Sequence, residues 1–409
     1  ILILLVTLGV GLRSYELTAR SLWFDEAFSW RLIQFPFNEM IDRAAADVHP
    51  PLYYILLRGW AKVFGSSLLA LRSFSVLLAG ATLAAAYGFV SSAMKSRRAG
   101  LITALLLAVS GWQIAFAWEA RMYTLGTALA FLSSWVLLKA IRKKETAWWL
   151  MYAVLAAAFA YTHYFAFFTI AAQALFAGGM LIQRTHGRIG EIIHLKEFWQ
   201  AVVTAIIISI LYIPWMPVFL QQNSQVQENY WVPEIGGWSI PDTFYRMFIP
   251  TAGIPTHIGW PAILAALPII LTITGWIVLV LGRRHKDALW LIASLGFVPF
   301  VLAIIISFLG QSLYQDRFLV FANIFIITAL ALLINRAVDR WRPWLVAGAT
   351  VFLLVTAGLF WRELDIPNRP GAKAATSEVA AQMVGGEEII VTSPFVYFSV
   401  INYIHEDHG

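Results

Sequence analysis

The sequence predicts an all-α polytopic membrane protein, and three features lead to that prediction. Hydrophobic residues make up 60% of the 409 residues and charged residues only 13%, whereas a soluble domain carries about 25% charged residues. Apolar runs close to membrane-spanning length recur along the chain. The 18 Trp and 14 Tyr residues suit the membrane–water boundary, where amphipathic rings gather. The absence of cysteine excludes disulfides, thiolate catalysis and Cys-based metal sites.

The apolar runs predict about eleven transmembrane helices. They lie at residues 1–12, 67–92, 100–117, 122–140, 147–162, 164–182, 200–219, 258–281, 288–309, 318–335 and 343–360. The first run begins with neither an initiator Met nor a charged n-region. We therefore interpret it as a membrane helix cut by a fragment boundary and not as a signal peptide.

Lys and Arg gather in every second connection between these runs. The basic connections are 94–98, 141–144, 183–196, 282–286 and 335–342. The positive-inside rule places them in the cytoplasm, together with the N-terminus. The other connections then face outward across the plasma membrane. Because the basic residues are explained in this way, the net charge of +6 does not indicate nucleic acid as a partner.

Three outward segments are predicted to be more than turns. The first external loop, 13–66, contains an amphipathic stretch at 35–48 and a short apolar stretch at 52–64, both expected to be interfacial helices. The loop at 220–257 is polar and aromatic. After a transmembrane catalytic domain at 1–360, the tail at 361–409 reads as a helix, a Gly-Gly turn and a β-branched strand, "EEIIVTS". We expect it to begin an extracytoplasmic α/β domain.

Charged and polar residues from different connections come to the outer face in this topology. They are Asp25, Glu26, His49, Glu119, Arg121, His163, Asp316 and Arg317. Carboxylates near hydrocarbon are costly, and aromatic neighbours such as Trp23 and Phe28 favour partial burial of the acidic pair in "SLWFDEAFSW". Partial burial would raise the pKa of a carboxylate and suit a general base. The alternative is a hydrated carboxylate pair without chemical function.

The motif "HPPLYY" predicts that His49 lies at a helix N-terminus, where anions such as phosphate are favoured. The alternative is a proline cap with an incidental His. In "WEARMY", Glu119 and Arg121 are two residues apart, so on one helix they would not face each other. Each is therefore available to a partner elsewhere, unless the motif is only an interfacial turn.

The motif "YTHYF" places His163 in a very short connection, either as a ligand-binding or as a hydrogen-bonded structural residue. In "YQDRF", Arg317 suits bidentate phosphate recognition. The alternative is an ion pair with Asp316 that anchors the helix. Nucleotide-binding loops, HExxH pairs and nucleophile elbows are absent from the sequence.

The order of these motifs resembles the bacterial branch of glycosyltransferase family 39. The motifs are "SLWFDEAFS", "HPPLYYILLRGWAKVFGSSLLALR", "WEARMY" and "YQDRF". The family consists of multi-spanning GT-C enzymes akin to protein O-mannosyltransferases and to the lipid A aminoarabinose transferase. The resemblance covers roughly residues 5–360 by hydropathy and motif order.

The resemblance implies a GT-C bundle that transfers a sugar from a polyprenyl-phosphate donor at the extracytoplasmic face. It implies Asp25 as the base of an inverting displacement, in an acidic cluster with Glu26 and Glu119. The residues expected to meet the donor phosphate or lipid are His49, Tyr53, Arg121, His163 and Arg317. The acceptor stays open between a protein, a lipid and a cell-wall glycan.

The chain also departs from its relatives. Tyr53 and Tyr54 stand where the O-mannosyltransferases have Gly and Lys, and His49 stands where the aminoarabinose transferase has Lys. Val48 stands where that enzyme has a zinc-binding Glu, so neither a metal nor another cofactor is carried over. The alternative functions are a flippase or transporter of polyprenyl-linked saccharides and a non-catalytic membrane scaffold. The clean spans, with charges only at their outer ends, favour the transferase.

Overall fold

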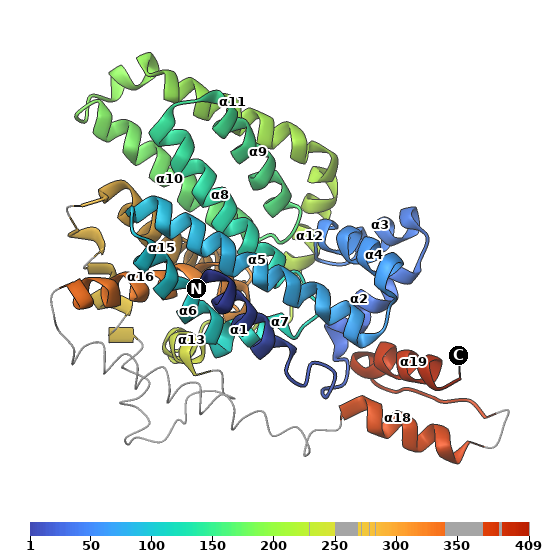
Figure 1. Ribbon diagram of the computed structural model, residues 1–409. Coiled ribbons are helices and arrows are strands. Elements are labelled where there is room, and N and C mark those ends of the chain that lie inside the picture. The colour runs from blue at the N-terminus through green and yellow to red at the C-terminus, as the bar shows by residue number, and fades with distance from the viewer. Residues whose placement is uncertain are drawn as a thin grey trace.

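The computed structural model is helical in every regular element of its described residues, as the sequence predicts (Figure 1). The structure describes residues 1–228, 230–249, 269–270, 272–277, 279–282, 284–339, 371–383 and 387–408. Within these residues, six helices are long and apolar enough to cross a membrane, or seven if a bent pair counts as one span.

Each predicted apolar run within the described residues is helical over most of its length. The run at 343–360 and most of the run at 258–281 lie outside the described residues. The number of about eleven spans stays a prediction from hydropathy.

The centre of the bundle is formed by α5 (Leu68–Met94) and α8 (Tyr123–Lys143), which pack against each other. On α8, Gly126 lies against the ring of Phe321, and a Cβ at this glycine would lie 2.2 Å from that ring. The close approach brings α16 (Val320–Asp339) against α8. This contact positions the start of α16, which directly follows the "YQDRF" motif and Leu319.

A break at Ser110 divides the next span into α6 (Arg97–Val109) and α7 (Gly111–Ala117), which meet at 62°. Such a break frees backbone carbonyls, which must find donors in an apolar environment. Arg13, at the end of α1 (Leu2–Ser14), is 1% exposed and donates to Ala108 O at 2.8 Å and to Leu107 O at 2.9 Å. The bent pair leads directly into the "WEARMY" connection.

The first external loop holds three helices, α2 (Phe24–Gln34), α3 (Phe37–Ala46) and α4 (Leu52–Phe64). The structure confirms the helices predicted at 35–48 and 52–64. The sequence analysis did not predict α2, which carries the acidic pair in its first turn. Negative side chains stabilise a helix N-terminus, so the pair itself favours the start of this helix.

The connection predicted to begin at residue 220 begins later in the structure. After α11 (Lys196–Tyr212) and the short η2 (Ile213–Trp215), α12 continues from Met216 to Glu228. Within α12, Gln222 is 1% exposed and donates to Ala44 O at 3.1 Å and Ala45 O at 3.0 Å, which satisfies carbonyls at the end of α3. A further helix, α13 (Ser239–Phe248), follows within the predicted loop.

Polar bonds draw several of the basic connections to one end of the bundle. In the last turn of α8, before the connection to α9 (Thr146–Ala160), Arg142 pairs with Asp287 of α15 (Lys286–Leu309) at 2.6 Å and donates to Ala93 O at 3.0 Å. At the end of α10 (Ala166–Arg184), Arg184 donates to Ile141 O at 2.7 Å. These connections therefore share one end, and the active-site candidates share the other.

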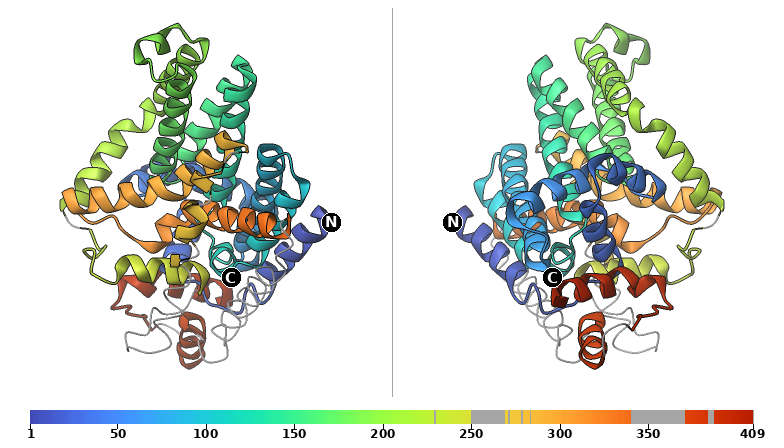
Figure 2. Two further views of the ribbon diagram at one scale, coloured as in Figure 1. Left: turned by 90° about the vertical axis from the view of Figure 1, so that its left-hand side faces the viewer. Right: turned by 90° about the vertical axis from the view of Figure 1, so that its right-hand side faces the viewer.

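The tail consists of α18 (Gly371–Gln382) and α19 (Pro394–His408), which lie on the side of the bundle that carries α2 (Figures 1 and 2). The helix predicted in the tail is confirmed. The strand predicted at "EEIIVTS" is wrong, because residues 387–393 have no regular secondary structure. A strand needs a hydrogen-bonded neighbour, and the described residues offer it none.

Candidate active site

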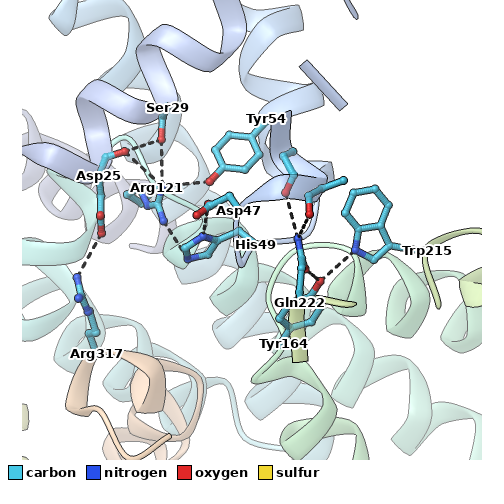
Figure 3. Close-up of polar contacts among 12 residues, drawn as sticks. Asp25, Ser29, Asp47, His49, Tyr54, Arg121, Tyr164, Trp215, Gln222 and Arg317 are labelled. Carbon is cyan, nitrogen blue, oxygen red and sulfur yellow. Dashed lines mark hydrogen bonds and ion pairs between the residues drawn. The ribbon is translucent and has the colours of Figure 1, made fainter. Parts of the chain in front are cut away.

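Asp25 lies in the first turn of α2 with its side chain 20% exposed. Its Oδ2 atom is 3.3 Å from the NH1 atom of Arg317 (Figure 3). This contact joins residues 292 positions apart, from the first external loop and from η3 (Asp316–Leu319). The structure thus brings together the acidic pair and the "YQDRF" motif, as the topology requires.

Arg317 is held by aromatic rings as well as by Asp25. Its guanidinium lies 4.8 Å from the ring centroid of Trp231 and 5.6 Å from that of Trp23, distances typical of cation–π contacts. The structure does not contain the alternative ion pair between the side chains of Arg317 and Asp316. Asp316 accepts the backbone N–H of Arg317 at 2.7 Å and lies 3.7 Å from Arg246. The Arg317 side chain is left for Asp25.

Glu26 has no exposed surface, and both of its carboxylate oxygens accept hydrogen bonds. Arg72 of α5 donates to both carboxylate oxygens, at 2.8 and 2.6 Å, and Ala120 N–H donates to Oε1 at 2.9 Å. This bidentate pair ties α2, α5 and the "WEARMY" connection together. Glu26 is therefore placed to position Asp25 and not to meet a substrate.

Arg72 was missed by the sequence analysis, although it closes the second quoted motif. Its NH1 atom also donates to Leu17 O at 2.7 Å and Arg20 O at 2.9 Å. One side chain therefore fixes the segment that leads into α2. An arginine near the start of an apolar span is itself unusual and would have been the clue to this role.

Arg121 is 1% exposed and extends beneath Asp25. Its NH1 atom donates to Asp25 O at 3.2 Å, Ser29 Oγ at 3.3 Å and Tyr54 OH at 3.1 Å (Figure 3). Its NH2 atom lies 3.1 Å from Nε2 of His49. The guanidinium thus joins α2, α4 and the "HPP" segment at a single point.

His49 lies between Arg121 and Asp47, which is 2.7 Å from its Nδ1 atom. A guanidinium only donates, so Nε2 of His49 accepts and Nδ1 carries the proton that is donated to Asp47. Burial would raise the pKa of Asp47, but His49 and Arg121 together hold that pKa below its ordinary value. Asp47 was not among the predicted site residues, because it looked like part of the polar face of α3.

His163 is 4% exposed and accepts the backbone N–H of Phe165 through Nδ1 at 3.1 Å. The ring proton is therefore on Nε2, which is buried and has no partner in the described residues. Burial first, and then His49 and Arg121, hold the pKa of His163 well below its ordinary value. His163 is therefore a neutral hydrogen-bond donor at neutral pH, with its ring centroid 6.3 Å from that of His49.

Glu119 differs from Glu26 because it has no matching cation. Its Oε2 atom is buried and has no partner in the described residues. Burial, followed by the negative charges of Glu26 and Asp25, raises the pKa of Glu119 to about 8. At neutral pH this carboxyl group is mainly protonated and can donate a hydrogen bond.

Tyr53 was expected to meet the donor, but the structure buries it fully in the core. Its ring packs 5.9 Å from that of Phe74, and its hydroxyl lies 3.4 Å from Ser75 Oγ. Tyr54 reaches Arg121 instead. Adjacent helical side chains point about 100° apart, so only one of the two tyrosines can face the site.

Two cavities adjoin this cluster. The apolar cavity, of about 280 Å³, is lined by aromatic and aliphatic side chains together with both histidines, His49 and His163. The polar cavity, of about 300 Å³, is lined by Glu26, Glu119 and Trp23, among others. Arg317 contacts Trp23 at one cavity and Phe318 at the other. Arg317, which is paired with Asp25, thus contacts one lining residue of each cavity.

A metal site is not evident in the described part of the chain, where no three His, Asp or Glu side chains gather closely enough to hold an ion. The polar groups that converge here are one accessible carboxylate, two arginines, a neutral histidine and a protonated carboxyl group. This set can accept a proton and receive an anion.

The comparisons with known proteins concern the family and the fold. A sequence model of the dolichyl-phosphate-mannose-protein mannosyltransferase family matches residues 48–216. No protein of curated function matches the chain in sequence.

Two solved structures share the fold. ArnT from Cupriavidus metallidurans, bound to undecaprenyl phosphate, is 12% identical with a TM-score of 0.62, over 98% of this chain and 84% of that one. The archaeal oligosaccharyltransferase AglB from Archaeoglobus fulgidus, in complex with an inhibitory peptide and a dolichol-phosphate, is 13% identical with a TM-score of 0.57, over 96% and 60%. The chain therefore has the fold of these polytopic membrane proteins, and the match over residues 48–216 agrees with the resemblance to family 39.

Proposed function

Since the chain has the GT-C fold and resembles glycosyltransferase family 39, we propose that it transfers a sugar from a polyprenyl-phosphate donor to an acceptor hydroxyl, with inversion. The fold and the matched family support a membrane glycosyltransferase with a lipid-linked donor. The observation that carries the finer proposal is the contact between Asp25 and Arg317, which pairs a candidate base with a cation that contacts one lining residue of each cavity.

Asp25 serves as the general base in this proposal. It takes the proton from the acceptor hydroxyl as that oxygen attacks the anomeric carbon and the bond to the phosphate breaks. Its side chain is partly exposed, whereas Glu26 is fully buried and bonded to Arg72. Of the two adjacent carboxylates, only Asp25 is open to a substrate.

Arg317 receives the leaving phosphate. A lipid phosphate departs as an anion, so positive charge and hydrogen-bond donors replace a general acid. Before the donor binds, Arg317 is paired with Asp25 at 3.3 Å. A phosphate that draws Arg317 away leaves the Asp25 carboxylate without its partner, and donor binding thereby releases the base.

The apolar cavity takes the isoprenoid end of the donor. Its phenylalanines, from α10, α12 and η3, suit a hydrocarbon chain. His163, which also lines this cavity, offers an Nε2–H that has no partner within the part of the chain that the structure describes. His49 is already bonded to Arg121 and Asp47, so it orders the site through them.

The polar cavity takes the acceptor. Glu119 lines it with a mainly protonated carboxyl group, which can donate a hydrogen bond to an acceptor oxygen because its Oε2 atom has no partner in the described residues. Trp23 is 37% exposed and adds an aromatic surface beside Asp25. The sugar and the acceptor class remain open to experiment.

The site faces the extracytoplasmic side in this proposal. Support comes from the basic connections at the opposite end of the bundle, such as the one around Arg142, because basic connections remain in the cytoplasm. A donor carried on a membrane lipid fits a site that cannot reach cytoplasmic nucleotide sugars.

Transfer and translocation can be separated in proteoliposomes that contain the purified protein. The probes are labelled undecaprenyl-phosphate mannose, glucose, galactose and arabinose, with membrane extract as the acceptor source. A transferase moves the label from one of these lipids to another molecule and inverts the anomeric configuration. Label that crosses the bilayer on an unchanged lipid would support a flippase instead, and retention of configuration would contradict the proposed displacement.

A further inference from the structure

Side chains of the C-terminal helix α19 form hydrogen bonds with the backbone N–H and C=O of Leu22, three residues before Asp25. Leu22 N–H donates to Tyr403 OH at 2.6 Å, and Ser399 Oγ donates to Leu22 O at 3.1 Å. Tyr403 and Ser399 are 2% and 1% exposed, and they lie 381 and 377 positions from Leu22 in the sequence. The backbone N–H and C=O of Leu22, which belong to two successive peptide groups, are thus both bonded to side chains of α19.

Aromatic contacts extend this interface on both sides of Asp25. The ring of Phe24 meets that of Phe395 edge-on at 5.3 Å, and the ring of Phe28 meets that of Phe398 at 6.3 Å. Edge-on pairs at these distances stabilise an interface beyond the area that they bury. Helices α2 and α19 pack against each other, as Figure 1 shows.

The interface matters because Asp25 has little else to hold its side chain. Among the described residues the carboxylate makes one ion-pair contact, with Arg317 at 3.3 Å, and its position otherwise follows the backbone of the first turn of α2. Arg72 fixes the preceding segment only as far as Ser21 O and then holds Glu26. Leu22 lies between Ser21 and Glu26, and its backbone N–H and C=O are bonded to α19.

We propose that Tyr403 and Ser399 are positioning residues that set the place of Asp25 beside Arg317 through the backbone N–H and C=O of Leu22. The inference rests on the proposed role of Asp25 as the base. It assigns α19 to the active site and not to an independent domain. A misplacement of a reacting group by about 1 Å can lower a rate about 100-fold, so two hydroxyls that hold the backbone of Leu22 act on turnover without touching substrate.

The test compares Tyr403→Phe, Ser399→Ala and the double variant with Tyr397→Phe in the full chain. Tyr397→Phe is the matched control, because Tyr397 lies on the same helix and is 46% exposed. It loses the same hydroxyl group without affecting the bonds to Leu22. We expect kcat per folded molecule to fall about 10- to 100-fold in the double variant, with an unchanged KM for the labelled undecaprenyl-phosphate sugar. Ser399→Thr, which keeps a hydroxyl, restores kcat, and Tyr397→Phe leaves it unchanged.

Hydrogen exchange at the Leu22 amide gives a second readout that needs no substrate. We expect faster exchange in Tyr403→Phe than in Tyr397→Phe. Wild-type kcat in the double variant, or a loss that merely follows the amount of folded protein, would overturn the proposal. Unchanged exchange at Leu22 would overturn it as well. Failure of the wild-type protein to transfer any of the labelled sugars would instead refute the proposed function, while the exchange experiment would still report on the contact.

Discussion

Asp25 and Glu26 are neighbours on one helical turn, but they lie in different environments. Glu26 is fully buried, with a bidentate partner in Arg72 and a backbone N–H from Ala120. Asp25 is partly exposed and has one longer ion pair, with Arg317. The direction of each side chain around α2 separates the two, because successive residues of a helix point about 100° apart.

The comparison shows how one short motif supplies both rigidity and reactivity. A carboxylate with saturated hydrogen bonds cannot also accept a proton from a substrate without losing those bonds. A carboxylate with a single partner can exchange that partner for a substrate. We therefore attribute anchoring of α2 to Glu26 and proton transfer to Asp25, and each of the following changes tests one side of this division.

The largest effect on stability is expected for Arg72→Ala. It leaves the Glu26 carboxylate buried without its cation, and breaking a buried pair in this way costs about 3–5 kcal/mol in the free energy of unfolding. Thermal unfolding of the purified protein in detergent measures the loss. Arg43→Ala is the matched control, since Arg43 pairs with Glu39 while 51% exposed, and exposed pairs contribute little. Equal melting temperatures for the two variants would contradict the anchoring role.

A smaller effect, on binding, is expected for Arg317→Ala. Hydrogen bonds to charged groups contribute about 1.5–3 kcal/mol, so the affinity for undecaprenyl phosphate should fall about 10- to 100-fold. Arg317→Lys keeps the charge but not the planar fork and should lie between that variant and the wild type. A binding titration with undecaprenyl phosphate decides the matter. Wild-type affinity in Arg317→Ala would return Arg317 to a structural role.

The smallest effect is expected in the pH dependence of stability, through Glu119. Its pKa in the folded protein is about 8, above the value of about 4.3 for an unperturbed Glu. Between these values the folded state binds a proton that the unfolded state has lost. The contribution of Glu119 is therefore complete at low pH and is lost as the pH rises toward 8. Glu119→Gln should flatten this decline in melting temperatures measured from pH 5 to pH 8. Parallel curves for variant and wild type would show that Glu119 is not protonated in the folded protein.

The sequence predicted the convergence of the site better than the division of its roles. Charge alternation and motif order placed Asp25, Arg121 and Arg317 at one end of the bundle, and the structure brings them into contact. Which end of the bundle a residue reaches follows from the order of the predicted spans alone. Which of Asp25 and Glu26 would be buried could not be predicted in the same way, because it depends on Arg72, a partner 46 residues away.

The remaining differences have similar physical causes. Tyr53 and Tyr54 were indistinguishable until the orientation of α4 was known. The segment at 387–393 has the composition of a strand, but strand formation requires a neighbour that composition does not reveal. Helix α2 was missed because its eleven residues show no clear apolar period, and tertiary contacts with α4 and α19 hold it.

The most direct test of the account is single-turnover transfer by Asp25→Asn with labelled undecaprenyl-phosphate sugar already bound. The substitution keeps the size of the side chain and removes the proton acceptor. We predict that transfer falls about 100- to 10,000-fold, while undecaprenyl phosphate still binds and the melting temperature stays near that of the wild type. Asp42→Asn, at an exposed position of α3, should transfer at the wild-type rate. Wild-type transfer by Asp25→Asn would contradict the assignment of Asp25 as the base.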